Sequence, residues 1–214
     1  MISSAHRRFD FGTMASDYDA WYETDAGRLH DATQKQAVLS MLPSAAAGKR
    51  GSLLDVGCGT GHWSVFFAEH GFDVTGIDVS PKMIAVAQAR NALHCRFAVA
   101  DVIKLPFLNG DFDLVSAMTV LEFVPDARRT CAEMMRCLKS GGFLMAGVLN
   151  RLTRINRERI AARAEPYASA RMFAPEELRK LLSEFGDVNI LVTTEHEMGG
   201  GESGALIIAA VIKP

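Results

Sequence analysis

Short apolar runs alternate with amphipathic stretches along the chain from residue 52 to residue 149. Apolar runs of this length, bounded by turn residues, are typical of buried strands. We therefore expect five strands, at Ser52–Val56, Phe72–Ile77, His94–Val99, Phe112–Met118 and Phe143–Leu149. The intervening stretches predict helices at Thr60–His70, at Ser80–Asn91 and at Ala127–Leu138. Alternation of strands and helices predicts a parallel sheet that is covered on both faces.

The C-terminal part of the pattern closes this sheet. A helix is expected from Pro175 to about Phe185, and two further strands at Val188–Thr193 and Ala205–Ile212. The glycine-rich segment Gly199–Gly204 is flexible enough to join these strands as an antiparallel hairpin. The predicted fold class is therefore α/β, with a Rossmann-like, seven-stranded, mostly parallel sheet, helices on both faces and a closing antiparallel strand.

Two segments lie outside the alternating pattern. Residues 1–48 predict two helices, at Asp17–Thr24 and Arg28–Leu42, ahead of a main domain at 49–214. Residues 150–173 form an insert with two glutamates and six arginines: Arg151, Arg154, Arg157, Arg159, Arg163 and Arg171. This insert is either a solvated helix face or a cap that presents cations to an acidic substrate.

Composition narrows the class of protein. The 214 residues are 49% hydrophobic and carry a formal net charge of −2, so we expect a packed core and no general affinity for nucleic acid. No apolar run reaches about 18 residues, which predicts no membrane-spanning helix. The N-terminus lacks the apolar stretch of a secretory signal. The four cysteines form no C-x-x-C pair, which favours reduced thiols and a cytoplasmic location.

A glycine-rich turn follows the first predicted strand. The sequence Leu53-Leu-Asp-Val-Gly-Cys-Gly-Thr-Gly61 runs from apolar residues into Asp55 and then into three alternating glycines. Such a turn lets a ligand approach bare backbone. The dinucleotide fingerprint places its third glycine one residue later, where this chain has the bulky His62. A carboxylate at Asp55 would also repel a pyrophosphate and attract a cationic ligand.

Three further strand ends carry candidate ligand contacts, because ligands of open parallel sheets bind at the carboxyl ends of the strands. Asp78 follows the second strand and could accept both hydroxyls of a ribose, as it also would in a nicotinamide enzyme, or it could cap the next helix. Asp101 could accept an adenine amino group while Val102 packs on the ring. Backbone carbonyls at Met118 and Thr119 could meet an ammonium group, with residues 120–123 as a floor.

Taken together, these motifs resemble class I S-adenosylmethionine-dependent methyltransferases over about residues 50–150. The N-terminal stretch Phe9–Tyr22 is similar to the opening of the small-molecule branch that includes quinone-pathway and biotin-pathway enzymes. The resemblance implies methyl transfer from S-adenosylmethionine to a small molecule, with residues 1–48 as a lid over the cofactor. It implies that Tyr18 binds the methionine carboxylate and that Trp21 or Tyr22 lines the substrate side. The implied cofactor-binding set is Tyr18, Asp55, Gly57, Cys58, Gly59, Gly61, Asp78, Val79, Met83, Asp101, Val102, Met118 and Thr119.

Catalytic groups are less well specified by the sequence. Glu122 and Tyr22 are the candidates for a base or substrate anchor, with His6, His30, Tyr167 and His196 behind them, and no spacing predicts a metal site. No N/D-P-P-Y/F pattern follows the fourth strand, so a nucleic-acid or protein acceptor loses support. We expect a small-molecule acceptor, no nucleic-acid or membrane partner, and a monomer or homodimer. A non-catalytic cofactor-binding protein and a nicotinamide oxidoreductase remain as alternatives.

Overall fold

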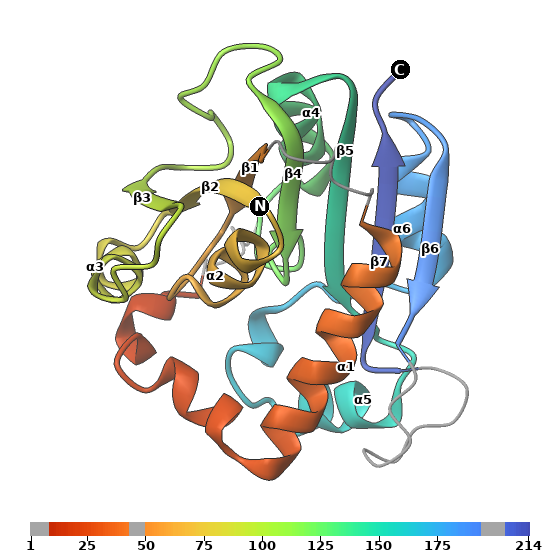
Figure 1. Cartoon of the computed structure of the whole chain (residues 1–214). Coiled ribbons are helices and arrows are strands. Elements are labelled where there is room, and N and C mark those ends of the chain that lie inside the picture. Colours follow the sequence, from red (N-terminus) through yellow and green to blue (C-terminus); the bar gives the residue numbers. More distant parts are fainter. Residues whose placement is uncertain (1–8, 43–49, 194–203) are drawn as a thin grey trace, which may run out of the picture.

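The computed structural model describes residues 9–42, 50–193 and 204–214 (Figure 1). Within these ranges seven strands form one sheet in the order β3-β2-β1-β4-β5-β7-β6. The first five strands are parallel, and β7 runs antiparallel to both of its neighbours. The predicted Rossmann-like α/β fold is thereby confirmed. The strands are β1 (Gly51–Val56), β2 (Phe72–Asp78), β3 (Cys95–Val99), β4 (Phe112–Met118), β5 (Leu138–Leu149), β6 (Val188–Val192) and β7 (Leu206–Ile212).

Helices cover both faces of the sheet. Figure 1 shows α1 and α2 in front of the strands and α4 and α6 behind them. None of the described helices is long and apolar enough to cross a bilayer. The α-helices are α1 (Asp25–Met41), α2 (His62–Glu69), α3 (Pro81–Ala89), α4 (Ala127–Cys137), α5 (Arg154–Ala161) and α6 (Pro175–Leu182). Three 3-10 helices accompany them in the described ranges: η1 (Phe11–Met14), η2 (Tyr18–Glu23) and η3 (Tyr167–Ser169).

The alternation of side chains along the strands builds two buried clusters. Leu53 of β1 packs in one cluster with Phe67 of α2, whereas the next residue, Leu54, packs in the other cluster with Met134 of α4. All four side chains have no exposed surface. Burying each of them stabilises the fold by about 1.5–3 kcal/mol. The core is therefore divided between the two faces, and the carboxyl ends of the strands remain available for a site.

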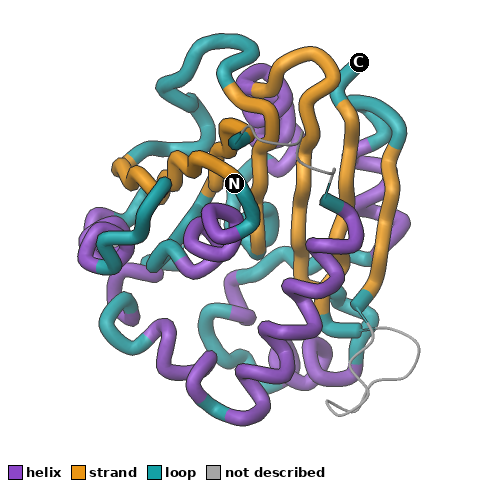
Figure 2. Tube along the Cα trace, in the orientation of Figure 1, coloured by secondary structure: helices purple, strands orange, loops and turns teal. Residues whose placement is uncertain are grey.

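Most element bounds differ from the predictions by one to three residues, and the largest differences lie in the N-terminal segment and at β5. The expected helix at Asp17–Thr24 is the 3-10 helix η2, and α1 begins at Asp25 because the Thr24 hydroxyl accepts a hydrogen bond from Gly27 N at 3.0 Å. Strand β5 begins at Leu138, earlier than expected, because Leu138 already pairs with Phe112 across a register shift. The predicted turn at 199–204 lies mostly outside the described residues. Figure 2 shows the many short helical turns of the N-terminal segment and of the insert.

Candidate functional site

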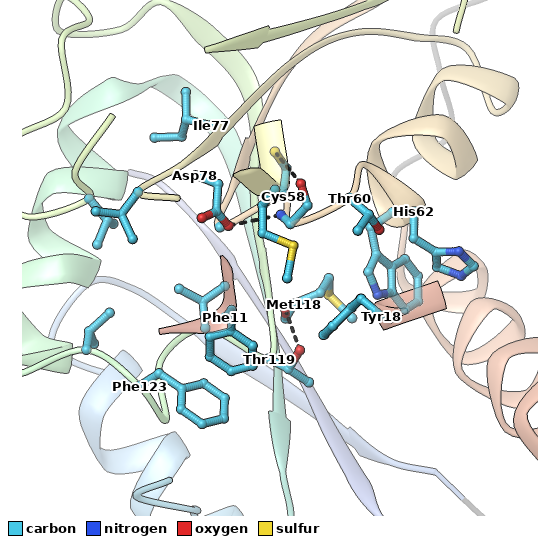
Figure 3. Close-up of a pocket in the computed structure, with 18 of the residues that line it drawn as sticks. Phe11, Tyr18, Cys58, Thr60, His62, Ile77, Asp78, Met118, Thr119 and Phe123 are labelled. Carbon is cyan, nitrogen blue, oxygen red and sulfur yellow. Dashed lines mark hydrogen bonds between the residues drawn. The ribbon is translucent and has the colours of Figure 1, made fainter. Parts of the chain in front are cut away.

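A cleft opens at the carboxyl ends of the parallel strands, between the glycine loop after β1 and the N-terminal segment (Figure 3). It measures about 940 Å³, its open mouth included. Twelve of the predicted site residues line it, and they come from η2, the glycine loop, α3 and the ends of β2, β3 and β4. They are Tyr18, Tyr22, Gly57, Cys58, Gly59, Asp78, Val79, Met83, Asp101, Val102, Met118 and Thr119.

The three glycines of the loop have different tasks, although all adopt positive φ angles. A Cβ at Gly61 would lie 2.9 Å from the Phe97 ring, and one at Gly57 would lie 2.5 Å from Val120 Cγ2. These two glycines permit close packing. A Cβ at Gly59 would meet no protein atom within 4 Å. Because Gly59 lines the cleft, it leaves backbone bare to a ligand.

Asp55 lies beneath the loop and does not line the cleft, contrary to the expected direct contact with a ligand. Its carboxylate accepts hydrogen bonds from Ser64 Oγ at 2.6 Å and from Ser116 Oγ at 2.7 Å. The side chain is 1% exposed. Desolvation outweighs the two serine hydrogen bonds and raises the pKa of Asp55 to about 6. Asp55 therefore fixes the start of α2 and the strand β4 against β1, and its charge acts on the cleft only from below.

Asp78 reaches the cleft at the end of β2. One carboxylate oxygen accepts from Gly59 N at 3.0 Å and the other from Ser80 N at 2.8 Å. Ser80 itself caps α3, since its hydroxyl accepts from Met83 N. Each carboxylate oxygen has two lone pairs and can accept more than one hydrogen bond. Asp78 thus joins the glycine loop to the start of α3.

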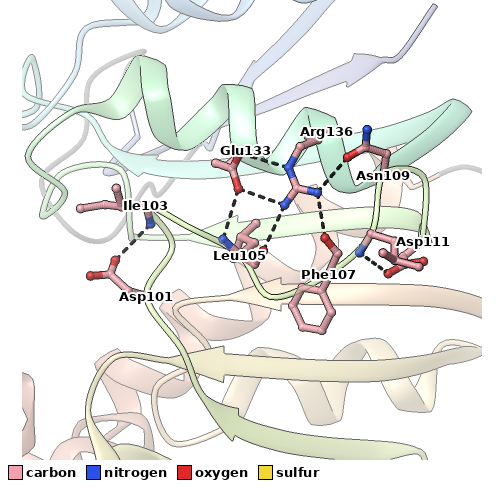
Figure 4. A network of polar contacts seen from close by, with 9 residues as sticks. Asp101, Ile103, Leu105, Phe107, Asn109, Asp111, Glu133 and Arg136 are labelled. Carbon is pink, nitrogen blue, oxygen red and sulfur yellow. Dashed lines mark hydrogen bonds and ion pairs between the residues drawn. The ribbon is translucent and has the colours of Figure 1, made fainter.

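The loop after β3 carries Asp101 and Val102, and Arg136 of α4 holds it from behind (Figure 4). The guanidinium donates to Phe107 O at 2.8 Å and to Leu105 O at 3.1 Å, and it forms an ion pair with Glu133 at 3.0 Å. Such a forked set of donors fixes backbone position better than a single contact does. This wall of the cleft is therefore anchored to a helix.

Thr119, directly after β4, has a strained backbone. Its φ angle is +54°, and a β-branched residue rarely adopts this region. Its N–H donates to Gly147 O at 2.7 Å, and its hydroxyl donates to Met118 O at 2.8 Å. Strain of this kind costs on the order of 1–3 kcal/mol and is concentrated at functional sites. The strained turn places Thr119 on the wall of the cleft.

Glu122 is turned away from the cleft. Its side chain is 2% exposed, and one carboxylate oxygen accepts a hydrogen bond from Leu149 N at the end of β5. The other oxygen has no hydrogen-bond partner among the described residues. Desolvation exceeds the effect of the backbone hydrogen bonds and raises the pKa of Glu122 to about 7. In the described position Glu122 anchors the loop and does not line the cleft.

The N-terminal segment forms the outer wall of the cleft and is tied to the main domain by polar and ring contacts. Asp19 accepts from Thr60 Oγ1 at 2.7 Å and forms an ion pair with Arg90. The Tyr22 ring stacks on His62, with centroids 4.1 Å apart. Burial raises the pKa of Tyr18 to about 12 and that of Tyr22 further. Both phenols are therefore protonated at neutral pH and can donate hydrogen bonds.

A second cavity, of about 840 Å³, adjoins the cleft. The two share part of their walls, namely Phe11, Tyr18, Tyr22, Trp63, Thr119 and Phe123. His30 and Tyr167 line this second cavity only. We call it the adjoining pocket.

The sequence interpretation missed several wall residues of the cleft. Phe9 and Phe11 approach it from the N-terminal segment, Thr60 lies within the glycine loop, and His62 and Trp63 follow that loop. Aromatic residues at these positions looked like ordinary helix packing. Asp55, Gly61 and Glu122, which the sequence pointed to, do not line the cleft. The candidates His6 and His196 lie outside the described residues.

Comparison with known proteins identifies related sequences and folds. Residues 54–146 match the family model described as a methyltransferase domain. The chain is 27% identical to an uncharacterised protein of Methanocaldococcus jannaschii, over 94% of this chain and 97% of that protein. It is 33% identical to the malonyl-[acyl-carrier protein] O-methyltransferase of Serratia marcescens, over 45% of this chain and 38% of that enzyme.

A solved structure from Thermotoga maritima has the same fold over almost its whole length. It is described as a SAM-dependent methyltransferase, possible histamine N-methyltransferase, and it matches with a TM-score of 0.77 at 25% identity. The match covers 95% of this chain and 98% of that one. The alignments with the curated methyltransferases cover between 32% and 62% of the length of those enzymes.

Proposed function

We propose a cofactor site and an acceptor site for this chain, which belongs to the class I S-adenosylmethionine-dependent methyltransferases. The cleft at the glycine loop holds the cofactor, and the adjoining pocket holds a small-molecule methyl acceptor. The observation that carries this proposal is the shared wall of the two cavities. An acceptor in one cavity would then lie next to a methyl donor in the other.

The residues of the cleft fit S-adenosylmethionine from end to end. Asp78 offers acceptors for the ribose hydroxyls, and Gly59 leaves the backbone bare beside them. Met83 and Val102 supply apolar walls for an adenine ring, with Asp101 at its edge. Among the described residues, no lysine or arginine, which a pyrophosphate would favour, lines the cleft. This lining supports S-adenosylmethionine over a nicotinamide dinucleotide.

The methionine part of the cofactor fits the other end of the cleft. Tyr18, protonated and pointing into the cavity, can donate to the methionine carboxylate. The strained turn at Thr119 presents backbone to an ammonium group. We propose residues 1–48 as the lid over this end, because η2 is tied to the glycine loop through Asp19. Residues 49–214 are the methyltransferase domain, with the insert at 150–173 as the far wall of the acceptor pocket.

S-adenosylmethionine supplies a methyl group on a sulfonium, which a nucleophile takes in line while the sulfur keeps the electron pair. The chain contributes orientation and exclusion of water, which can lower a barrier by roughly 7–11 kcal/mol. Tyr22 stays protonated at neutral pH and cannot serve as a base. Glu122 contacts neither cavity. We therefore propose that the acceptor brings a nucleophile of low pKa and that neither Tyr22 nor Glu122 acts as a general base.

We also propose a cytoplasmic location and a small-molecule acceptor. All four cysteines are free thiols, which supports a cytoplasmic location. The acceptor pocket measures about 840 Å³, its open mouth included, which suits a small molecule better than a nucleic acid.

The test is transfer of tritiated methyl from S-adenosylmethionine to a library of small acceptors. The proposal predicts labelled acceptor and an equal amount of S-adenosylhomocysteine, with inhibition by added S-adenosylhomocysteine. Cofactor binding without transfer to any acceptor would instead support a non-catalytic binding protein.

A further inference from the structure

The wall of the adjoining pocket is mainly aromatic. Trp21 and Tyr22 come from η2, Trp63 from α2, Phe123 from the loop after β4, and Tyr167 from η3. Faces and edges of aromatic rings favour other rings in stacked or edge-on contact. A flat, unsaturated ligand therefore suits this pocket better than a flexible aliphatic chain.

Arg159 is the single charged side chain on this wall among the described residues. His30 and Gln34, which are polar and also line the pocket, are hydrogen-bonded to each other. No aspartate or glutamate of the described ranges lines the pocket. The pocket therefore carries one positive charge with no acid beside it on the wall.

The neighbouring arginines of the insert are otherwise engaged. Arg151 pairs with Glu177, and Arg154 pairs with Glu158. Arg159 has no carboxylate within ion-pair distance in the described parts of the chain. It donates to Asn156 Oδ1 at 3.1 Å, and its guanidinium lies 4.5 Å from the Tyr167 ring centroid. These two contacts orient the guanidinium and leave most of its five N–H donors for a ligand.

The position of Arg159 within the pocket indicates how a bound ligand would be oriented. Arg159 lines the adjoining pocket only, whereas Tyr18, Thr119 and Phe123 line both cavities. A group bound at Arg159 thus lies off the wall that the two cavities share. Resting on the proposed function, the methylated atom would lie at the shared wall and the bound group off that wall.

We propose that the acceptor is an aromatic acid whose carboxylate pairs with Arg159 and whose nucleophile lies at the other end of the ring. Arginine and carboxylate form two parallel charge-assisted hydrogen bonds, a geometry that a neutral amide cannot reproduce. An aromatic amine would place a second cation beside Arg159. The carboxylate serves for recognition and remains free in the product.

The test uses fluorescence, because the two tryptophans of the chain, Trp21 and Trp63, both line the pocket. Three phenols that differ only in their para substituent are titrated with S-adenosylhomocysteine present: 4-hydroxybenzoate, 4-hydroxybenzamide and 4-hydroxybenzylamine. We expect the carboxylate to bind at least tenfold more tightly than the other two. Arg159→Met should remove this preference, and Arg159→Lys should retain part of it.

Arg154→Met is the matched control, because Arg154 lies on the same helix and is paired with Glu158 outside the pocket. It should leave all three dissociation constants unchanged. Equal affinity for the three probes, absence of carboxylate binding, or an unchanged preference in Arg159→Met would overturn the inference. Failure of S-adenosylhomocysteine to bind, measured separately by calorimetry, would instead count against the proposed function.

Discussion

At the scale of single residues, Glu122 makes the free energy of unfolding depend on pH. Its pKa of about 7 in the folded protein lies above the ordinary value of 4.5, so the folded state keeps this proton to higher pH than the unfolded chain does. The free energy of unfolding therefore falls as the pH rises from about 4.5 to 7. The loss from this group amounts to about 3 kcal/mol above pH 7.

The variant Glu122→Gln removes this titration and retains a side-chain oxygen that can accept from Leu149 N. Urea unfolding at pH 5 and at pH 8 should show a smaller loss of stability in the variant than in the wild type. Asp55 titrates in the same range in both proteins, so the difference between them isolates Glu122. Glu176→Gln, at an exposed position, is the control. Identical pH dependence in Glu122→Gln and wild type would refute the assignment.

Sequence alone could place Asp78 but not the orientation of Asp55 or Glu122. Asp78 follows an apolar run directly, so the fold carries it to the edge of the sheet. The orientation of Asp55 depends on Ser116, which is 61 positions away, and that of Glu122 depends on Leu149, which is 27 positions away. Partners so distant in the chain become visible only when the strand register is known.

At the scale of elements, the glycine loop makes a paired prediction. Gly61→Ala combines a strained φ of +83° with contact at 2.9 Å to Phe97, so it should destabilise the fold by about 1–3 kcal/mol. Gly59→Ala has a φ of +53° and no contact within 4 Å, so its loss of stability should be about 1 kcal/mol. The added methyl group would nevertheless occupy the ligand side of the loop.

Thermal unfolding and cofactor titration of both variants distinguish the packing role of Gly61 from the ligand-binding role of Gly59. Gly59→Ala should keep most of its stability and lose cofactor affinity by tenfold or more. Gly61→Ala should lose more stability. A Gly59→Ala protein that binds the cofactor as well as the wild type would show that the ligand does not approach this backbone.

The N-terminal segment and the insert show where element-level prediction fails. Thr24 caps α1 and a Cβ at Gly27 would come within 1.9 Å of Trp21 O, so η2 can fold back only because residue 27 is glycine. Periodicity cannot distinguish such a 3-10 segment from a short α-helix. Similarly, the six arginines of the insert look alike in the sequence, and only the fold separates Arg159 from those that pair with glutamates.

At the scale of the whole molecule, the parallel sheet gathers the motifs at one end. Strands β1, β2 and β4 are neighbours in the sheet, although their carboxyl ends are separated by 22 to 62 positions in the chain (Val56, Asp78 and Met118). Alternation of strands and helices sufficed to predict this arrangement, because crossover connections place consecutive strand ends at the same edge. The adjoining pocket could not be predicted, since it needs the N-terminal segment, the insert and the sheet together.

The central claim is that the cleft binds S-adenosylmethionine through Asp78 and the glycine loop. Calorimetric titration of wild type and Asp78→Ala with S-adenosylmethionine, S-adenosylhomocysteine and NADH tests it most directly. We predict micromolar binding of the first two, none of NADH, and affinity at least tenfold lower in Asp78→Ala, since a lost charge-assisted hydrogen bond costs about 1.5–3 kcal/mol. Binding of NADH alone, or unchanged affinity in Asp78→Ala, would contradict it.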